Sequence, residues 1–414
     1  MEVKPLRVVM FTNTYLPLVG GVERSVESSA EALRRAGHSC LVVAPSSPQL
    51  EKEEHTLRLP AIQSFLGTPF AYRLPALGRL RARLREFAPD VVHVHHPFML
   101  GETGLRCARS FGLPLVFTSH TRWERFFPQS PPWVRRLAQQ LPIAFANVCA
   151  LVITPSPSID RLLRRRGLRT PSVVVPTGVD LNQAQRGSRA RARSRWCLPP
   201  GAAVIGHVGR LVPEKNLGFL AAAVGRTLAM ESSARFLLVG DGPAACEVAA
   251  SLAALGVGDR LVATGVLQGE ELHDAYAAMD VFAFSSRTDT QGLVLVEAMA
   301  AGCGVVALDA PGPRDVVGPA AGILVPARAS VGEFASALAG ALERAGSFRP
   351  AALNCAASFD LDACTERLLG AYRQAIENHH PVHGLFGLRR VARRLATERL
   401  LLGQKAALAG SVLG

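Results

Sequence analysis

Short β-branched segments alternate with helix-competent stretches through both halves of this 414-residue chain. This alternation is typical of right-handed β-α-β units around a parallel sheet. Strands are predicted in the first half at Val8 to Phe11, Ser39 to Val43, Val91 to His95, Leu115 to Ser119, Leu151 to Thr154 and Val173 to Val175. They recur in the second half at Val204 to Val208, Arg235 to Val239, Leu261 to Thr264, Val281 to Phe284 and Val305 to Leu308. We therefore expect two doubly wound α/β lobes, with ligands bound beyond the carboxyl ends of the strands in the cleft between them.

The length of the chain suits two domains of similar size. A stretch rich in Arg, Ser, Ala and Gly from Gln183 to Arg195 marks the border between them. The first domain is predicted over residues 1–185 and the second over residues 196–360, followed by a closing helix over residues 361–378. A basic, amphipathic tail is predicted over residues 383–414.

The composition indicates in which cellular compartment the protein is expected. Apolar residues make up 49% of the chain, and its eight cysteines show no Cys-x-x-Cys spacing, so reduced thiols in a cytoplasmic protein are expected. The segment before the first strand leaves no room for a signal peptide, and no apolar run reaches the length of about 18 residues that a membrane-spanning helix needs.

A formal charge of +13 predicts an anionic partner. Nucleic acid is not favoured, because the chain has neither zinc-finger spacing nor an aromatic and basic strand motif. An anionic membrane surface is preferred, which would place the protein peripherally on the inner face of the plasma membrane. The helix around Leu77 to Phe87 is interpreted as an ordinary solvated amphipathic helix, with a membrane-contacting basic surface as the alternative. For the tail, a membrane-surface helix and an exposed or partner-bound segment are equally supported.

Three loops carry groups that could bind a phosphate and sugar rings. In the run from Ser285 to Ala300, two carboxylates, Asp289 and Glu297, lie eight positions apart around a turn that opens a helix. Backbone amides of that turn can face an anion, and they make donor-binding candidates of Gln291, Gly292, Leu293 and Val294. A double glycine, Gly20 and Gly21, opens a helix after the first strand, and two cations, Arg210 and Lys215, follow the strand Val204 to Val208.

These motifs, together with Thr-Ser-His-Thr around His120, resemble the retaining glycosyltransferases of family GT4, which have the two-domain GT-B fold. The resemblance covers most of residues 1 to about 378 and is nearest to transferases that glycosylate diacylglycerol or related lipids. The family pattern is Glu, seven residues, Glu; here Asp289 takes the first place, which shortens the carboxylate by one methylene. The resemblance implies that Asp289 contacts the transferred sugar and Glu297 the ribose. It also implies that Arg210 and Lys215 hold the diphosphate at Gly20 and Gly21.

The same resemblance makes His120 an active-site residue that contacts the donor sugar or its departing oxygen, and it implies that the closing helix returns to the first domain. No metal or other cofactor is expected. The three histidines His93, His95 and His96 do not suggest a metal site, because strand alternation sends the first two to one face and the third to the other. The Asp-x-Asp pair Asp360 and Asp362 is interpreted as a helix N-cap.

The predicted function is transfer of a hexose from a UDP- or GDP-linked donor to a lipid or lipid-linked acceptor. The acceptor side falls in the first domain, where Pro97 to Thr103 and Arg122 to Pro128 place apolar and basic groups beside strand ends. Plain core packing explains those segments equally well. Two alternatives stay open: transfer to a soluble or polysaccharide acceptor, and a non-catalytic protein that binds a nucleotide sugar.

Overall fold

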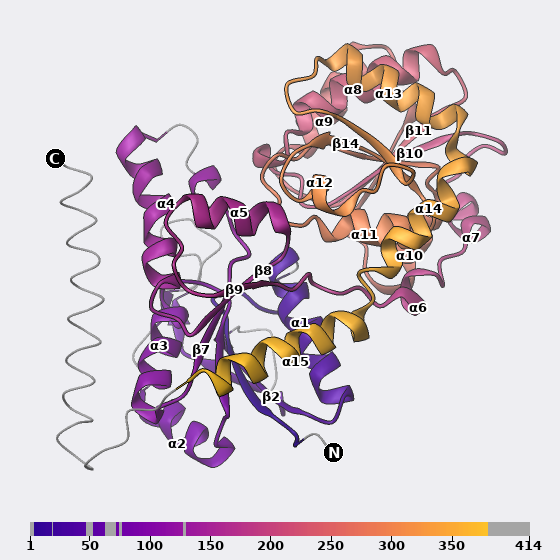
Figure 1. Ribbon diagram of the computed structural model, residues 1–414. Coiled ribbons are helices and arrows are strands. Elements are labelled where there is room, and N and C mark those ends of the chain that lie inside the picture. The colour runs from indigo at the N-terminus through magenta and orange to yellow at the C-terminus, as the bar shows by residue number, and fades with distance from the viewer. Residues whose placement is uncertain are drawn as a thin grey trace, which may run out of the picture. The chain divides into compact units, whose positions relative to one another are not determined.

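The structure, a computed structural model, describes residues 4–18, 20–46, 53–62, 72–73, 77–126 and 130–379. The chain forms two compact units: Met1–Gly178 together with Cys364–Gly414, and Val179–Ala363. Each is an α/β unit with its own parallel sheet (Figure 1). The predicted tail at 383–414, and residues 127 and 128 of the predicted acceptor segment, lie outside the described residues.

The first unit is built on a seven-stranded parallel sheet in the order β3-β2-β1-β6-β7-β8-β9. Its strands are β1 (Arg7–Phe11), β2 (Ser39–Pro45), β3 (Thr56–Leu59), β6 (Val91–Val94), β7 (Leu115–Thr118), β8 (Leu151–Thr154) and β9 (Ser172–Val174). A small antiparallel pair joins β4 (Ala61–Ile62) to β5 (Tyr72–Arg73).

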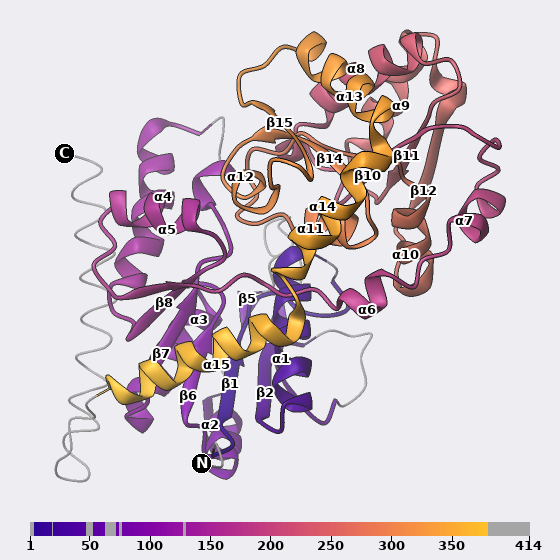
Figure 2. The same ribbon diagram turned by 45° about the vertical axis from the view of Figure 1, so that its right-hand side comes forward.

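Helices cover both faces of this sheet, which explains why its central strands read as unbroken apolar runs. One face packs against α1 (Gly21–Arg35) and α15 (Leu361–Glu377), both of which are labelled in Figure 2. The other face packs against α2 (Leu77–Phe87), α3 (Leu100–Phe111), α4 (Pro132–Ala146) and α5 (Pro157–Arg165). The last helix of the described chain therefore belongs to the core of the first unit.

The second unit has a six-stranded parallel sheet in the order β12-β11-β10-β13-β14-β15. Its strands are β10 (Val204–Val208), β11 (Arg235–Val239), β12 (Leu261–Gly265), β13 (Val281–Phe284), β14 (Gly304–Asp309) and β15 (Gly322–Pro326). On one face lie α6 (Leu181–Ala184), α7 (Arg189–Arg195), α10 (Gly269–Ala278), α11 (Leu293–Ala300), α12 (Pro313–Val316) and α14 (Ala345–Ala357). On the other lie α8 (Leu217–Met230), α9 (Ala245–Ala254) and α13 (Val331–Glu343).

The prediction of two doubly wound, Rossmann-like parallel sheets is confirmed. The predicted helix after β1 is present as α1, and Gly37 follows its end with φ 84°, the left-handed conformation of a C-terminal glycine. The sequence analysis did not foresee β3, the β4–β5 pair or β15.

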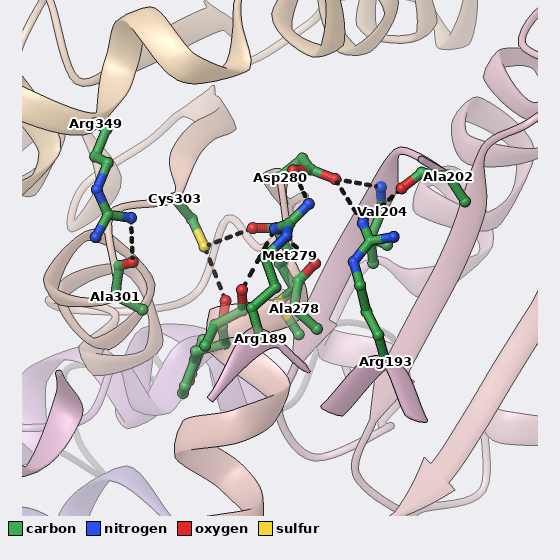
Figure 3. Close-up of polar contacts among 12 residues, drawn as sticks. Arg189, Arg193, Ala202, Val204, Ala278, Met279, Asp280, Ala301, Cys303 and Arg349 are labelled. Atoms are coloured by element: carbon green, nitrogen blue, oxygen red, sulfur yellow. Dashed lines mark hydrogen bonds and ion pairs between the residues drawn. The ribbon is translucent and has the colours of Figure 1, made fainter. Parts of the chain in front are cut away.

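The arginine-rich stretch from Gln183 to Arg195 folds as part of α6 and α7 inside the second unit, which begins at Val179. Figure 3 shows how Asp280 anchors it: Oδ1 accepts a hydrogen bond from Arg189 at 2.6 Å, and Oδ2 lies 3.7 Å from Arg193. Oδ2 also accepts from the backbone amide of Val204 at 2.8 Å. The arginines thus fix this segment to the amino-terminal ends of β10 and β13.

Candidate active site

Each sheet has one point at which the strand order reverses, between β1 and β6 in the first unit and between β10 and β13 in the second. Ligands of doubly wound folds bind outside the carboxyl ends of the strands at such a point. In the second unit these ends lead into two loops, residues 209–216 after β10 and residues 285–292 after β13. Both loops carry residues that the sequence analysis singled out.

Lys215 and Asp289 meet at this edge of the second sheet. A short 3₁₀ turn, η3 (Pro213–Lys215), presents Lys215, whose Nζ lies 2.7 Å from Oδ1 of Asp289. Both side chains are 18% exposed. Burial raises the pKa of the Asp289 carboxyl, but the charge and hydrogen bond of Lys215 outweigh it and hold the pKa below its ordinary value. Asp289 is therefore ionised at neutral pH.

The second carboxylate oxygen of Asp289, Oδ2, is buried and has no hydrogen-bond partner within the described part of the chain. An ionised carboxylate accepts hydrogen bonds with both oxygens and donates none. Buried polar atoms nearly always have a partner, so this oxygen is an acceptor prepared for a donor that a ligand brings.

Hydrogen bonds between the two loops hold the pair in place. The Ser285 hydroxyl lies 3.0 Å from the carbonyl oxygens of both Lys215 and Asn216. The side-chain amide of Asn216 donates to the Ser285 carbonyl at 3.2 Å, and the Thr288 hydroxyl donates to the Glu214 carbonyl at 3.3 Å. Asn216 has the left-handed backbone conformation (φ 59°) that ends η3 and starts α8. These bonds fix the two loops to each other and hold Lys215 beside Asp289.

Glu297 lies in α11, which begins at Leu293 after Gly292 in the left-handed conformation (φ 84°). Its Oε2 accepts a hydrogen bond of 2.6 Å from the hydroxyl of Tyr276 in α10, whose ring is buried in the core. The carboxylate is thus held in one orientation. Leu293 and Val294 form the first turn of α11, and Gln291 is buried just before it. The structure therefore gathers all the residues predicted between Asp289 and Glu297 at the amino end of this helix.

Arg210 follows β10 in the same loop as Lys215, but it is much more exposed, with 48% of its side chain open to solvent. Its Nη2 lies 3.6 Å from Oε1 of Glu214. At that distance and exposure the ion pair contributes little to stability. The contact with Glu214 therefore does not explain Arg210 as a structural residue, and its guanidinium can turn toward a ligand.

In the first unit, α1 begins at Gly21 after the switch-point strand β1. Gly20 has extended backbone (φ −166°), and a Cβ there would collide with the Glu23 carboxylate, which is buried in the first turn of α1. Glycine at this position lets the acidic side chain fold back over the helix start. A carboxylate near a helix amino terminus is favourable, since the helix dipole is positive there.

His120 follows β7 at the carboxyl edge of the same sheet, and 2.9 Å separates its Nε2 from Nδ1 of His95. The rings of these two histidines stack at 5.2 Å. Burial lowers the pKa of His120 to about 4 and that of His95 well below its ordinary value, so both are neutral at pH 7.

The neighbouring histidines have structural partners. His93 places Nδ1 2.8 Å from the hydroxyl of Tyr372 in α15 and Nε2 2.7 Å from Thr118 Oγ1, while Nδ1 of His96 accepts from the backbone amide of Asn13 at 3.2 Å. Among the described residues, no group of three or more His, Cys, Asp or Glu side chains is arranged to hold a metal ion. Asp360 caps α15, since its Oδ1 accepts from the amides of residues 362 and 363 at 3.1 Å; this N-cap prediction is confirmed.

A cavity of about 530 Å³ opens at the opposite, amino-terminal edge of the second sheet, lined in part by Arg189 and Arg349 (Figure 3). Arg189 donates to the carbonyls of Ala277 and Ala278, and Arg349 donates to the carbonyl of Ala301. Both arginines thus cap the carboxyl ends of α10 and α11, a stabilising position for a cation. This structural role accounts for them, so the cavity is not our candidate site.

Sequence reasoning missed two residues that lie close to the candidate site residues, Tyr276 in α10 and His207 in β10. Tyr276 looked like an ordinary core residue of a helix, and its link to Glu297 crosses 21 positions of sequence. His207 lies inside a predicted strand, where a buried apolar residue is the norm, and an imidazole at such a position is the one signal that could have drawn attention to it.

Comparison with known proteins identifies the family. The model of Glycosyltransferase Family 4 matches residues 19–183, and that of Glycosyl transferases group 1 matches residues 202–344. A GDP-mannose-dependent alpha-mannosyltransferase of Mycobacterium tuberculosis is 34% identical over 350 residues, which cover 80% of this chain and 85% of that protein. The chain belongs to glycosyltransferase family 4. It is an enzyme of the hexosyltransferase class that uses a nucleotide sugar.

This family 4 glycosyltransferase is also similar to alpha-monoglucosyldiacylglycerol synthase of Streptococcus pneumoniae, at 26% identity over 73% of this chain and 71% of that protein. Its fold is that of sucrose-phosphate synthase from Thermosynechococcus elongatus, with a TM-score of 0.73 and 22% identity over 89% of this chain and 99% of the other. The GT-B prediction is thereby confirmed. No helix in the described part of the chain is long and apolar enough to cross a membrane.

Proposed function

We propose that this glycosyltransferase moves a hexose, with retention of configuration, from a nucleotide diphosphate sugar to a lipid or lipid-linked acceptor at the cytoplasmic face of the membrane. The observation that carries the proposal is the Lys215–Asp289 pair, with a buried acceptor oxygen left over on Asp289. A cation for the diphosphate and an acceptor for a sugar hydroxyl lie side by side at the switch point of the sheet.

In this proposal Lys215 and Arg210 stabilise the negative charge that develops on the departing diphosphate. Preorganised charges of this kind lower the barrier by about 3 kcal/mol each, because they need no reorganisation during the reaction. Oδ2 of Asp289 accepts a hydroxyl of the transferred hexose, and Glu297, oriented by Tyr276, binds the ribose. The amides around Gly292 and at the start of α11 face the donor.

His120 contacts the donor sugar or its departing oxygen. Because its imidazole is neutral, it can exchange hydrogen bonds with a hydroxyl without adding a charge to a buried site. Gly20 and Gly21 present the amides at the start of α1 to the diphosphate once the Glu23 carboxylate, which folds back over this helix start, turns away from it. No metal or other cofactor is required, since the two cations supply the positive charge that the leaving group needs.

The donor and the acceptor are suggested by the relatives. The mycobacterial relative is named as GDP-mannose-dependent, so GDP-mannose is the first donor to test, with UDP-glucose the second. The pneumococcal relative is named for a glucosylated diacylglycerol, which supports a lipid acceptor for this chain. A surplus of cationic residues, with a formal charge of +13, suits work at an anionic membrane surface.

The test is incubation of the purified protein with bacterial membrane lipids and a panel of UDP- and GDP-linked hexoses, following nucleotide release and glycolipid mass. A new glycolipid with one donor supports the proposal. Nucleotide binding without turnover on any lipid contradicts it, and would favour a soluble or polysaccharide acceptor or a non-catalytic binding protein. In that event Asp289→Glu, which restores the longer carboxylate, is the first change to make.

A further inference from the structure

His207 lies in β10 with only 1% of its surface exposed, two residues before the loop that carries Arg210 and Lys215. Its ring stacks on Phe282 and Phe284 of β13, with centroids 6.1 and 6.4 Å away. Nδ1 lies 2.9 Å from the carbonyl oxygen of Ala283. The imidazole is therefore held in one place and one orientation.

This contact fixes the tautomer. A carbonyl oxygen only accepts hydrogen bonds, so Nδ1 of His207 must carry the proton and Nε2 must present a lone pair. Burial lowers the pKa of His207 to about 4, so the ring stays neutral at pH 7. Nε2 is buried, and nothing in the described residues donates to it. A buried acceptor without a partner is rare enough to require an explanation.

The position of Nε2 indicates what its partner could be. A Cβ built on Gly209 would lie 3.8 Å from Nε2. Nε2 therefore lies beside the backbone where β10 ends and the loop that carries Arg210 begins. The charges of Lys215 and Asp289 both act on the imidazole. At the carboxyl edge of the second sheet, two buried hydrogen-bond acceptors thus lack a donor: Nε2 of His207 and Oδ2 of Asp289.

The two unpaired acceptors indicate which chemical group of a ligand could bind here, because that group must donate hydrogen bonds. A diphosphate offers only oxygen acceptors at neutral pH, so it cannot satisfy a lone pair. A metal cation would have to approach next to the Lys215 ammonium. Hydroxyl groups donate to both kinds of acceptor, and a hexose carries several of them. The pair of acceptors therefore fits a polyhydroxylated group beside the diphosphate.

We propose that Nε2 of His207 accepts a hydrogen bond from a hydroxyl group of the bound nucleotide sugar and helps to select the hexose. The inference rests on the proposed function, because it takes the carboxyl edge of the second sheet to be the donor site. In this proposal His207 contacts the sugar of the donor, whereas the nucleoside diphosphate is bound by other residues.

The decisive comparison is His207→Asn against wild type. The side-chain amide of Asn can keep the hydrogen bond to Ala283, since it lies near the position of Nδ1, but nothing replaces Nε2. Isothermal titration calorimetry would be run with GDP-mannose against GDP and with UDP-glucose against UDP. We expect the nucleotide sugar that wild type prefers to bind about three- to tenfold more weakly to the variant, with the affinity for the free nucleoside diphosphate unchanged.

A second pair protects the test against a variant that fails to fold. His207→Gln places an acceptor oxygen near Nε2, and His207→Leu has none; we expect the Gln variant to bind the nucleotide sugar more tightly than the Leu variant. Equal affinities in a folded pair, or an equal loss for sugar and free diphosphate, would overturn the inference while leaving the proposed function intact. Failure of wild type to bind any of the four nucleotides would overturn both.

Discussion

The buried histidines of the first unit make its stability depend on pH, and His93 allows the effect to be calculated. Burial lowers the pKa of His93 from 6.5 to about 3, and the charge of His120 adds to the effect. The folded protein therefore keeps this ring neutral at a pH where the unfolded chain protonates it. Because the unfolded state then binds more protons, the stability is complete above pH 6.5 and is lost progressively as the pH falls toward 3.

The magnitude follows from the two pKa values. At pH 5 the unfolded chain is about 1.5 pH units below the pKa of its histidine, and each unit corresponds to about 1.4 kcal/mol, so His93 costs about 2 kcal/mol relative to pH 7.5. In His93→Asn this cost disappears, although the variant loses a hydrogen bond to Tyr372 or Thr118. We expect the variant to be less stable than wild type at pH 7.5, and this gap to shrink by about 2 kcal/mol at pH 5.

Hydrogen exchange of the amides in β6 and β7, corrected for the intrinsic rate at each pH, measures the opening free energy of this unit directly. The matched control is His55→Asn, because the His55 side chain is 54% exposed and lies outside the buried cluster. This control measures how much of the difference arises from replacing any histidine of the first unit by Asn, apart from the buried cluster. A gap for His93→Asn that is the same at pH 5 and pH 7.5 would refute the reasoning.

Two further predictions test the site and the packing beneath it. Tyr276→Phe removes the hydroxyl that orients Glu297, and we expect calorimetry to show about tenfold weaker binding of the nucleoside diphosphate with unchanged thermal stability; unaltered affinity would contradict the role of this bond. Gly101→Ala would drive a Cβ into the His96 carbonyl and should cost about 3 kcal/mol in urea unfolding, whereas Gly78→Ala meets open space in α2 and should cost nothing. Similar losses in both glycine variants would argue against the close packing of α3 on this loop.

Local sequence signals predicted those features that depend on neighbouring residues. The N-cap at Asp360 and the left-handed Gly37 follow from hydrogen bonds and backbone geometry within a few positions. Most strands of both sheets were visible as short apolar runs. The strand β15 could not be recognised in this way, because its apolar run is short and lies between Gly322 and Pro326.

Features that join distant segments could not be read in the same way. The Lys215–Asp289 pair spans 74 positions, and only the placement of β10 next to β13 brings its members together. The sequence marked both residues as candidates but gave no sign that they pair with each other. The bare Nε2 of His207 depends in turn on the Ala283 carbonyl of the adjacent strand, which no sequence pattern reveals. Folding thus decides which atoms remain available to a ligand.

The most direct test of the account is the catalytic efficiency of Lys215→Met, measured as kcat/KM with the donor that supports transfer. Methionine keeps most of the length of the side chain and removes its charge. We predict a loss of about 10²- to 10³-fold, because one preorganised cation at the diphosphate is gone. A folded Lys215→Met enzyme that transfers hexose at the wild-type rate would contradict the assignment of this edge of the sheet as the donor site.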